Sequence, residues 1–439
     1  MVGTPTTGRP GSWQRGLGLL RAFRMDGHRL LLGARGIVGV LEALTCGGAL
    51  RVSRSRDSLP TRGKRTTAAA PETPPKIVLD GVIFQLARHG TGLGISRVWT
   101  RIMAEWMASG FSEHVLVLDR GGLAACRDGF ACRPTPRWRG PNAVAQRFML
   151  EEICVAEHAD LFVSTYYTQP TFCRSLLLLH DMTPEVLGDD LTDGQWREKH
   201  RAIRHASAYV SVSRNTAHDF RGFFPSEATK PMRIMVLAPD PVFAPAPAGE
   251  ITSLLHTLNL PKRYYVFVGD RRGYKNAQLA FRALESGMAP TDLGLLCVGG
   301  RSTLEPELAE LAEGHEVRVA SLSDKQLRAA YSGSAALLYP STYEGFGLPI
   351  LEAMACGCPV ITCDNSSQRE VAADAALYVD DKDPRELSAA MLHALRNDVR
   401  RDLARRGVER SGLFSWKRSA ADLASAIQLC ADRPRLGAT

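Results

Sequence analysis

Two glutamates with seven residues between them, Glu344 and Glu352, have the side-chain types and spacing that most clearly suggest chemistry. They lie in the stretch EGFGLPILE, where Gly345 and Gly347 let the backbone approach a ligand closely. Pro349 suits the first turn of a helix, and the free N–H groups and positive dipole of such a helix start attract phosphate. Carboxylates beside an anion site are better suited to sugar hydroxyls than to the phosphate itself. The stretch therefore predicts a site for a nucleotide that carries a second sugar.

A strand, a loop, a helix and a second strand must position these two carboxylates. Residues 335–339 form a short apolar run, which is typical of a parallel strand buried on both faces. Gly357 is expected to end the helix, and residues 358–363 resume as a strand. Such a unit places its loop and helix start at the carboxyl edge of the sheet, where ligands bind. The alternative is an ordinary crossover with solvated glutamates.

The longer phrase EGFGLPILEAMACGCPV resembles the signature of family-4 retaining glycosyltransferases of the GT-B fold. The resemblance covers residues 77–430 and implies an α/β protein with two Rossmann-like domains that face each other across a cleft. It also implies that Glu344 binds the donor sugar and stabilises an oxocarbenium-like transition state, while Glu352 holds ribose hydroxyls. The other residues of the phrase that are expected to bind the donor are Gly345, Phe346, Gly347 and Leu348.

A basic turn, GDRRGYKN, follows a predicted strand and starts at Gly269. Arginine suits bidentate phosphate contacts, and lysine supplies a point charge. In the family that the chain resembles, an arginine and a lysine of this turn hold the donor diphosphate, which assigns that role to Lys275 and Arg271. Arg272 is the rival arginine, because many members carry theirs directly after the glycine, where this chain has Asp270. A solvated basic turn is the alternative.

The first half begins with residues 77–86, an apolar stretch that predicts a strand, followed by a glycine-rich turn and a helix. The resemblance places Gly92 and Gly94 at the donor or acceptor site, and a tight strand–helix turn is the alternative reading. The helix carries apolar residues at helical spacing, namely Val98, Ile102 and Trp106.

A His–Asp pair follows the predicted strand 176–179. An isolated pair of this kind is more often structural than catalytic. The resemblance implies that His180 reaches the donor sugar, and Asp181 would orient its ring. Ser213, after another predicted strand, is expected to cap a helix.

The formal charge of +8 is concentrated at the start of the chain. Residues 1–75 contain twelve basic and four acidic side chains, and the remainder contains equal numbers of each. The body therefore needs no nucleic-acid partner.

The cysteines show no zinc-site spacing. Asp381 and Asp383 superficially match the Asp-x-Asp metal motif, but Asp383 is expected to be a helix cap before Pro384. No metal or other cofactor is expected; the nucleotide-diphosphate sugar is a substrate.

The predicted domain division is a basic extension, an N-terminal acceptor domain, a C-terminal nucleotide-sugar domain and a final helix that crosses back to the first domain. Their bounds are 1–75, 76–245, 246–415 and 416–439. Within the extension, residues 30–50 contain too many charges and glycines for a spanning helix. They suit a helix on an anionic membrane surface, which residues 1–65 would contact, or else a packed helix or a disordered leader. The expected location is the cytoplasm, with peripheral membrane attachment as an option.

The sequence thus predicts a retaining, metal-independent hexosyltransferase. It would move mannose, rhamnose or a similar sugar from a nucleotide diphosphate to a glycan or lipid-linked glycan in surface polysaccharide synthesis. Three alternatives remain from the sequence: a phosphorylase, an epimerase, and a catalytically silent scaffold in a polysaccharide assembly complex. Incorporation of labelled sugar into an acceptor separates the transferase from the first two. Absence of nucleotide-sugar binding would indicate the scaffold.

Overall fold

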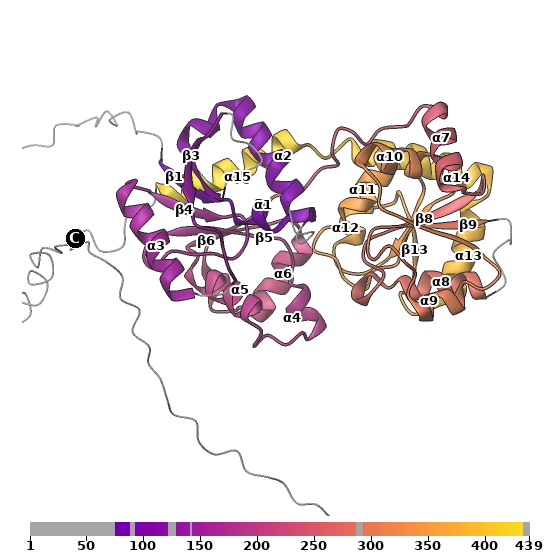
Figure 1. Ribbon diagram of the computed structural model, residues 1–439, viewed down its shortest axis with the longest axis horizontal. Coiled ribbons are helices and arrows are strands. Elements are labelled where there is room, and N and C mark those ends of the chain that lie inside the picture. The colour runs from indigo at the N-terminus through magenta and orange to yellow at the C-terminus, as the bar shows by residue number, and fades with distance from the viewer. Residues whose placement is uncertain (1–74, 88–92, 122–128, 141–142, 287–292, 433–439) are drawn as a thin grey trace, which may run out of the picture. The chain divides into compact units, whose positions relative to one another are not determined.

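The computed structural model describes residues 75–87, 93–121, 129–140, 143–286 and 293–432. These residues form two parallel sheets, each with helices on both faces (Figure 1). The basic extension and residues 30–50 lie outside the described part, so the predictions about them stay predictions. Among the described residues, no helix is both long and apolar enough to cross a membrane.

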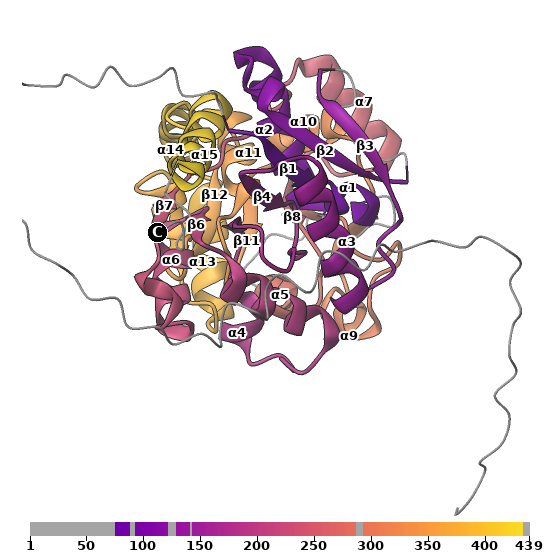
Figure 2. The ribbon, with the colours of Figure 1, turned by 90° about the vertical axis from the view of Figure 1, so that its left-hand side faces the viewer.

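The N-terminal half, residues 75–247, is built on a seven-stranded sheet in the order β3-β2-β1-β4-β5-β6-β7, with every neighbouring pair parallel. Much of this order can be followed from right to left in Figure 2. Its strands are β1 Ile77–Asp80, β2 Val115–Arg120, β3 Ala131–Thr135, β4 Leu161–Ser164, β5 Ser175–Leu179, β6 Ala208–Ser211 and β7 Met232–Ile234. Its helices are α1 Val82–Ala87, α2 Leu93–Ser109, α3 Ala143–Ala156, α4 Thr183–Leu187, α5 Gly194–His205 and α6 Arg214–Phe223, with the 3-10 turns η2 Phe111–His114 and η3 Glu227–Thr229.

The C-terminal half, residues 248–415, has a six-stranded parallel sheet in the order β10-β9-β8-β11-β12-β13. Its strands are β8 Tyr264–Val268, β9 Gly294–Val298, β10 Glu316–Ala320, β11 Leu337–Tyr339, β12 Val360–Cys363 and β13 Leu377–Val379. Its helices are α7 Ala248–Leu258, α8 Ala277–Glu285, α9 Pro306–Leu311, α10 Asp324–Gly333, α11 Leu348–Ala355, α12 Gln368–Ala372, α13 Pro384–Ala394 and α14 Asn397–Ser411, with the 3-10 turn η4 Gly273–Lys275.

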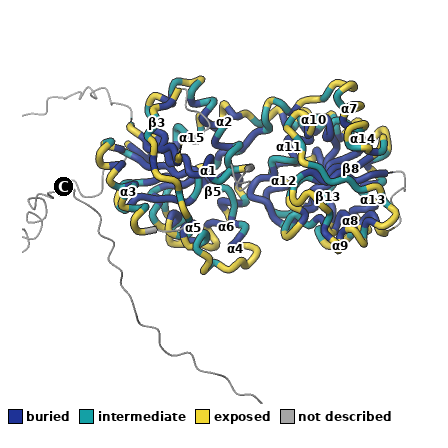
Figure 3. Tube along the Cα trace, in the orientation of Figure 1, coloured by how far each residue is buried: buried dark blue, intermediate teal, exposed yellow. Residues whose placement is uncertain are grey.

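Alternation along the strands divides the core of each sheet between its two faces. In β5, Leu176 and Leu178 join one apolar cluster, while Leu177 and Leu179 join another with α5 and α6. This period of two is what a strand covered on both sides requires. The inner strands of both sheets are accordingly buried, whereas the edge strand β3 and the outer sides of the helices are largely exposed (Figure 3).

The last helix, α15 Trp416–Ala431, packs on the N-terminal half, against α2. The Trp106 indole of α2 donates to the carbonyl of Ala420 at 3.0 Å. The Ser419 hydroxyl donates to the carbonyl of Val236 before the connector. Both Trp106 and Ala420 are buried, so this contact is part of the core and not a surface association.

The apolar stretch 77–86 was predicted to be one strand, and this prediction was wrong beyond Asp80. The chain turns at Gly81, and α1 begins at Val82. The hydroxyl of Thr165, in the loop after β4, accepts the backbone N–H of Ile83 at 3.1 Å and so satisfies the helix start. A continuous apolar run fits a buried strand or a buried helix equally well, and a cap supplied from 82 residues away cannot be read locally.

Candidate donor site

Lys275 and Glu344 form an ion pair, with 2.7 Å between Lys275 Nζ and Glu344 Oε1. Lys275 ends the turn after β8, and Glu344 lies in the loop after β11, the parallel neighbour of β8. The Lys275 ammonium also donates to the Tyr339 hydroxyl at 2.9 Å. Neighbouring parallel strands thus bring the predicted basic turn and the predicted sugar-binding carboxylate together at the carboxyl edge of the sheet.

The turn that carries Lys275 is held in two ways. Gly269 has φ +135°, and a Cβ there would lie 3.4 Å from Lys275 Cδ, so the lysine side chain lies over the glycine. Asn276, at φ +55°, donates through Nδ2 to the carbonyls of Pro340 and Asp381. These contacts hold the backbone of Lys275 in place near the end of β11.

The loop that carries Glu344 is fixed by two serines that precede α12. Ser366 Oγ accepts the backbone N–H of Glu344 at 3.0 Å. Ser367 Oγ lies 2.9 Å from the carbonyl oxygens of both Glu344 and Phe346. Gly347, at φ +99°, makes the turn into α11. These contacts position the loop backbone while leaving the Glu344 carboxylate directed to Lys275.

Helix α11 starts at Leu348, and no side chain of the described residues caps its first turn. Its free N–H groups remain suited to an anion. Phe346 is placed differently: its ring is buried and lies edge-on to Phe414 at 6.2 Å between centroids. Any donor contact by Phe346 would therefore come from its backbone.

Gly345 packs directly on the backbone of His180, from the opposite half of the chain. A Cβ at position 345 would lie 2.0 Å from the carbonyl oxygen of His180 and 2.8 Å from Asp181 Cβ. Ser213 Oγ and Thr216 Oγ1 donate to the Gly345 carbonyl at 2.7 and 3.0 Å. The structure thus brings together His180 and the glutamate loop, which are 165 positions apart in sequence. Ser213 also caps α6, as predicted, by accepting the Thr216 N–H.

The His180 ring is neutral at physiological pH. Burial, with a smaller effect of Lys199, lowers its pKa to about 4, although Asp181 acts in the opposite direction. Its Nε2 atom is buried and has no hydrogen-bond partner among the described residues. A neutral, unpartnered ring nitrogen can donate to or accept from a hydroxyl, depending on its tautomer.

A buried ion pair supports the His180–Asp181 turn from behind. Lys199 Nζ lies 2.7 Å from Glu185 Oε2 and 3.2 Å from the Asp181 carbonyl, and Glu185 Oε1 lies 2.9 Å from His200 Nε2. The side chains of Lys199 and Glu185 are each 1% exposed. This pair ties α4 and α5 to the turn that carries the histidine.

Glu352 lies about one turn into α11 and is 5% exposed. Its Oε1 accepts from Arg97 Nη1 at 3.0 Å, so a residue of α2 in the N-terminal half reaches it. Burial raises the pKa of Glu352 to about 7, and Arg97 acts against that rise. Near neutral pH this carboxyl is therefore divided between its two protonation states.

Arg271 does not face the Lys275–Glu344 pair. Its side chain is 0% exposed, with Nε 2.7 Å from Glu305 Oε2 and the two terminal nitrogens on the carbonyls of Gly299, Arg301 and Thr303. These contacts hold the loop after β9. In this conformation they leave no route to a diphosphate, which counts against the role predicted for Arg271. Its rival Arg272 is exposed and bonded to Asp270.

The glycines predicted in the first half are less informative. Gly94 opens α2 as an exposed residue, and a Cβ there would meet nothing within 4 Å. Gly92 lies outside the described residues.

Asp383 caps α13 by accepting the N–H groups of Arg385 and Glu386, which confirms the predicted helix cap.

Two residues near the site had no role assigned from the sequence. Tyr339 read only as an apolar strand residue, yet its hydroxyl contacts Lys275. Burial raises the pKa of Tyr339 well above its usual value, so the phenol stays protonated and hydrogen-bonded. Arg97 ends the sequence GISR, residues 94–97, which follows the glycine-rich turn, and this position beside Gly94 is the signal that could have pointed to it.

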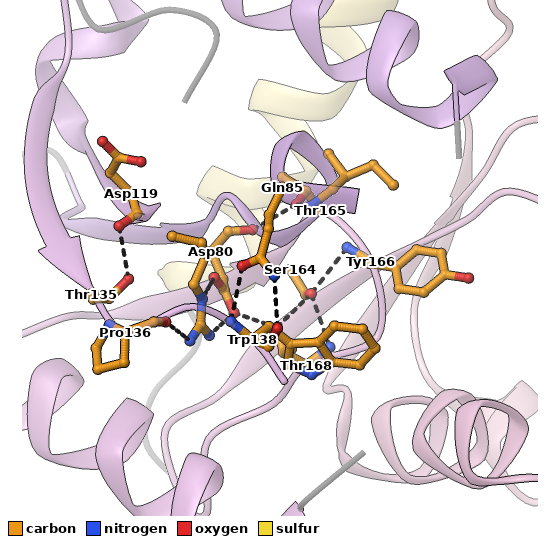
Figure 4. A network of polar contacts seen from close by, with 12 residues as sticks. Asp80, Gln85, Asp119, Thr135, Pro136, Trp138, Ser164, Thr165, Tyr166 and Thr168 are labelled. Carbon is orange, nitrogen blue, oxygen red and sulfur yellow. Dashed lines mark hydrogen bonds and ion pairs between the residues drawn. The ribbon is translucent and has the colours of Figure 1, made fainter. Parts of the chain in front are cut away.

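A second polar network lies at the carboxyl edge of the N-terminal sheet (Figure 4). Asp80, at the end of β1, accepts from Arg120 Nε and Nη2 at 2.7 and 2.5 Å and from Thr168 Oγ1 at 2.6 Å. Gln85 exchanges two hydrogen bonds with the backbone of Trp138. Asp80 and Arg120 are at most 2% exposed, so this network frames the sheet edge and offers no free charge to a ligand.

The sequence pattern of one family, described as glycosyl transferases group 1, matches residues 256–410. O-antigen chain mannosyltransferase B of Escherichia coli is 27% identical over 277 residues, which are 60% of this chain and 72% of that protein. The C-terminal half of this chain is therefore similar to the glycosyl transferases group 1 family. The relatives of this chain include O-antigen mannosyltransferases.

Solved structures agree on the architecture. WaaG, a glycosyltransferase involved in lipopolysaccharide biosynthesis, has a TM-score of 0.62 at 16% identity and covers 80% of this chain and 98% of its own. Anabaena HepE in complex with UDP and glucose has a TM-score of 0.60 at 15% identity and covers 80% of this chain and 99% of its own. The protein therefore has the GT-B fold, as the sequence predicted.

Proposed function

We propose that this protein is a glycosyltransferase that moves a hexose, such as mannose or rhamnose, from a nucleotide diphosphate to a glycan or lipid-linked glycan, with retention of anomeric configuration. The observation that carries the proposal is the 2.7 Å Lys275–Glu344 pair beside the uncapped start of α11. The backbone of the loop that carries Glu344 is packed on His180 through Gly345. The mannosyltransferase named above supports the substrate class.

Each polar group has a role in this proposal. Lys275 and the first N–H groups of α11 would stabilise charge that grows on the leaving diphosphate. Glu344 would hold the sugar and stabilise the oxocarbenium-like transition state. His180 Nε2, buried and without a partner among the described residues, would bond a sugar hydroxyl. Glu352 would accept ribose hydroxyls. Arg271 is left out of this set, because Glu305 and three carbonyls occupy it.

The proposed reaction is an exchange of one bond at the anomeric carbon. The bond to the diphosphate oxygen breaks, and its electron pair stays on the diphosphate. The acceptor hydroxyl oxygen forms the new bond on the same face, and its proton passes to the leaving diphosphate. Lysine and a helix dipole supply the positive charge in this scheme, so a metal ion is not required by it.

Calorimetric titration with UDP, GDP, dTDP and ADP, each with and without EDTA, tests the donor site. We expect tight binding of one diphosphate that EDTA does not change. Transfer of labelled sugar from the corresponding donor to a glycan acceptor then separates a transferase from an epimerase or phosphorylase. Loss of binding in EDTA would contradict metal independence. Absence of binding by all four would refute the donor site and favour a scaffold.

A further inference from the structure

Arg97 joins two acidic residues that belong to the other half of the molecule. Its Nη1 donates to Glu352 Oε1 at 3.0 Å, and its Nη2 donates to Asp324 Oδ1 at 2.6 Å. The Arg97 side chain is 26% exposed, and its guanidinium lies 5.6 Å from the centroid of the Phe243 ring. One planar group thus spans α11, α10 and the connector, a geometry that lysine cannot reproduce.

The surroundings of Glu352 show why this contact matters. The charged and titratable groups that act on Glu352 from other elements are Arg97 from α2, Asp324 and Tyr331 from α10, and Asp240 from the connector, and the Cys356 thiol acts on it from the end of α11 itself. Two of these are acids, one is a phenol and one is a thiol, so Arg97 is the only cation of this described set. Glu352 Oε1 is bonded to Arg97, whereas the contact that Oε2 makes within the described part of the chain is a long one of 3.5 Å from the Tyr331 hydroxyl.

We infer that Arg97 is a positioning residue for nucleotide binding, which favours the ionised form of Glu352 and orients it so that Oε2 accepts the ribose hydroxyls. The inference rests on the proposed function, in which Glu352 is the ribose carboxylate. It assigns to α2 of the N-terminal half a part in a site whose other groups come mainly from the C-terminal half. Docking of α2 against α11 then prepares the carboxylate before the nucleotide arrives.

The protonation of Glu352 gives this role a measurable signature. Burial raises the pKa of Glu352 to about 7 even with Arg97 in place, because Arg97 only partly opposes the effect. Removing the cation raises that pKa further. If the ionised carboxylate binds ribose, affinity falls as pH falls through this pKa, and the fall moves to higher pH without Arg97. His180, with a pKa of about 4, titrates outside this range.

The test measures the affinity of UDP and GDP by calorimetry across the neutral pH range for wild type, Arg97→Met and Arg101→Met. Arg101 is the matched control: it lies one turn later on α2, has the same 26% exposure, and pairs with Asp240 at 3.6 Å instead of Glu352. We expect the midpoint of the pH dependence to rise in Arg97→Met by about one unit or more, which weakens binding about fivefold at pH 7. Well above both midpoints, only the loss of orientation remains, so the difference in affinity between the two proteins should become smaller.

Three further results bear on the inference. Glu352→Gln should abolish the pH step, and Arg97→Lys should give an intermediate midpoint, because it keeps the charge but not both contacts. Equal weakening of Arg97→Met at every pH, no shift at all, or the same shift in Arg101→Met would overturn the inference. The Arg97→Lys series decides the matter if Arg97→Met does not fold. Absence of nucleotide binding by wild type would instead refute the proposed function beneath it.

Discussion

At the scale of single residues, the proposed site depends on charges that satisfy one another. The side chains of Lys275 and Glu344 are 16% and 9% exposed, so each ion loses much of its hydration on folding. The pair replaces part of that hydration. A donor diphosphate would offer Lys275 a second anionic partner while Glu344 turns to the sugar. The same two residues would thus serve stability without substrate and catalysis with it.

Replacement of Lys275 by methionine should separate these roles. We expect kcat to fall about 10²- to 10³-fold, as when one preorganised donor to developing negative charge is removed. Measured kcat and donor KM in Lys275→Met, compared with wild type, test this. Lys382→Met removes an exposed lysine of the same half and should leave both constants unchanged. A rate in Lys275→Met within a few-fold of wild type would remove this residue from the proposed mechanism.

At the scale of elements, the sequence predicted the βαβ unit around the glutamates closely. Strand β8 ends at Val268, directly before the predicted turn at Gly269, and β11 and β12 were found within the predicted runs 335–339 and 358–363. Short apolar runs between glycines and prolines carry this information locally. Gly345 was predicted to allow close backbone approach, but the observed neighbour is the carbonyl of His180.

The polar partners could not be predicted in the same way. Arg271 and Lys275 lie in one turn, and the sequence assigned both to the diphosphate. In the structure Arg271 pairs with Glu305, 34 positions away, whereas Lys275 pairs with Glu344, 69 positions away. Arg97 meets Glu352 across 255 positions. Such pairings depend on which strands become neighbours and how the halves dock, and a single sequence does not display either.

The contact at Gly345 gives a prediction at the element scale. In Gly345→Ala the new methyl group would lie 2.0 Å from the His180 carbonyl oxygen, so the loop or the histidine turn must shift. Forced overpacking of this kind costs about 1–3 kcal/mol, and it should also displace His180 and reduce kcat. Thermal unfolding and kcat check both effects.

The control for this substitution is Gly249→Ala in α7, where a Cβ meets nothing within 4 Å. It should be neutral or stabilising by up to about 1 kcal/mol, because alanine suits a helix better than glycine. If Gly345→Ala matches Gly249→Ala in both stability and kcat, the tight packing of the loop on His180 has no functional meaning.

At the scale of the whole molecule, three further contacts join the halves beside the site. The Glu370 carboxylate of α12 accepts the N–H groups of Arg214 at 3.0 and 2.9 Å and of Asn215 at 3.3 Å, at the start of α6. The Tyr343 hydroxyl donates to Asp219 Oδ2 at 2.7 Å. With the Gly345 carbonyl on Ser213, these contacts gather at the first turns of α6. That helix start binds an anionic side chain of the other half, as its dipole favours.

Glu370→Gln therefore tests whether contact between the halves limits the reaction. An amide keeps the size of the side chain but loses the charge, and a bond to a charged group is worth about 1 kcal/mol more than a neutral one. The population with the halves in contact should fall about fivefold relative to the separated one. We expect a larger radius of gyration in solution scattering and a kcat/KM lowered by a similar factor. Glu386→Gln, whose carboxylate bonds only within its own half through the Asp380 N–H, is the matched control and should change neither. An unchanged radius together with an unchanged kcat/KM in Glu370→Gln would show that this contact does not govern how the halves meet.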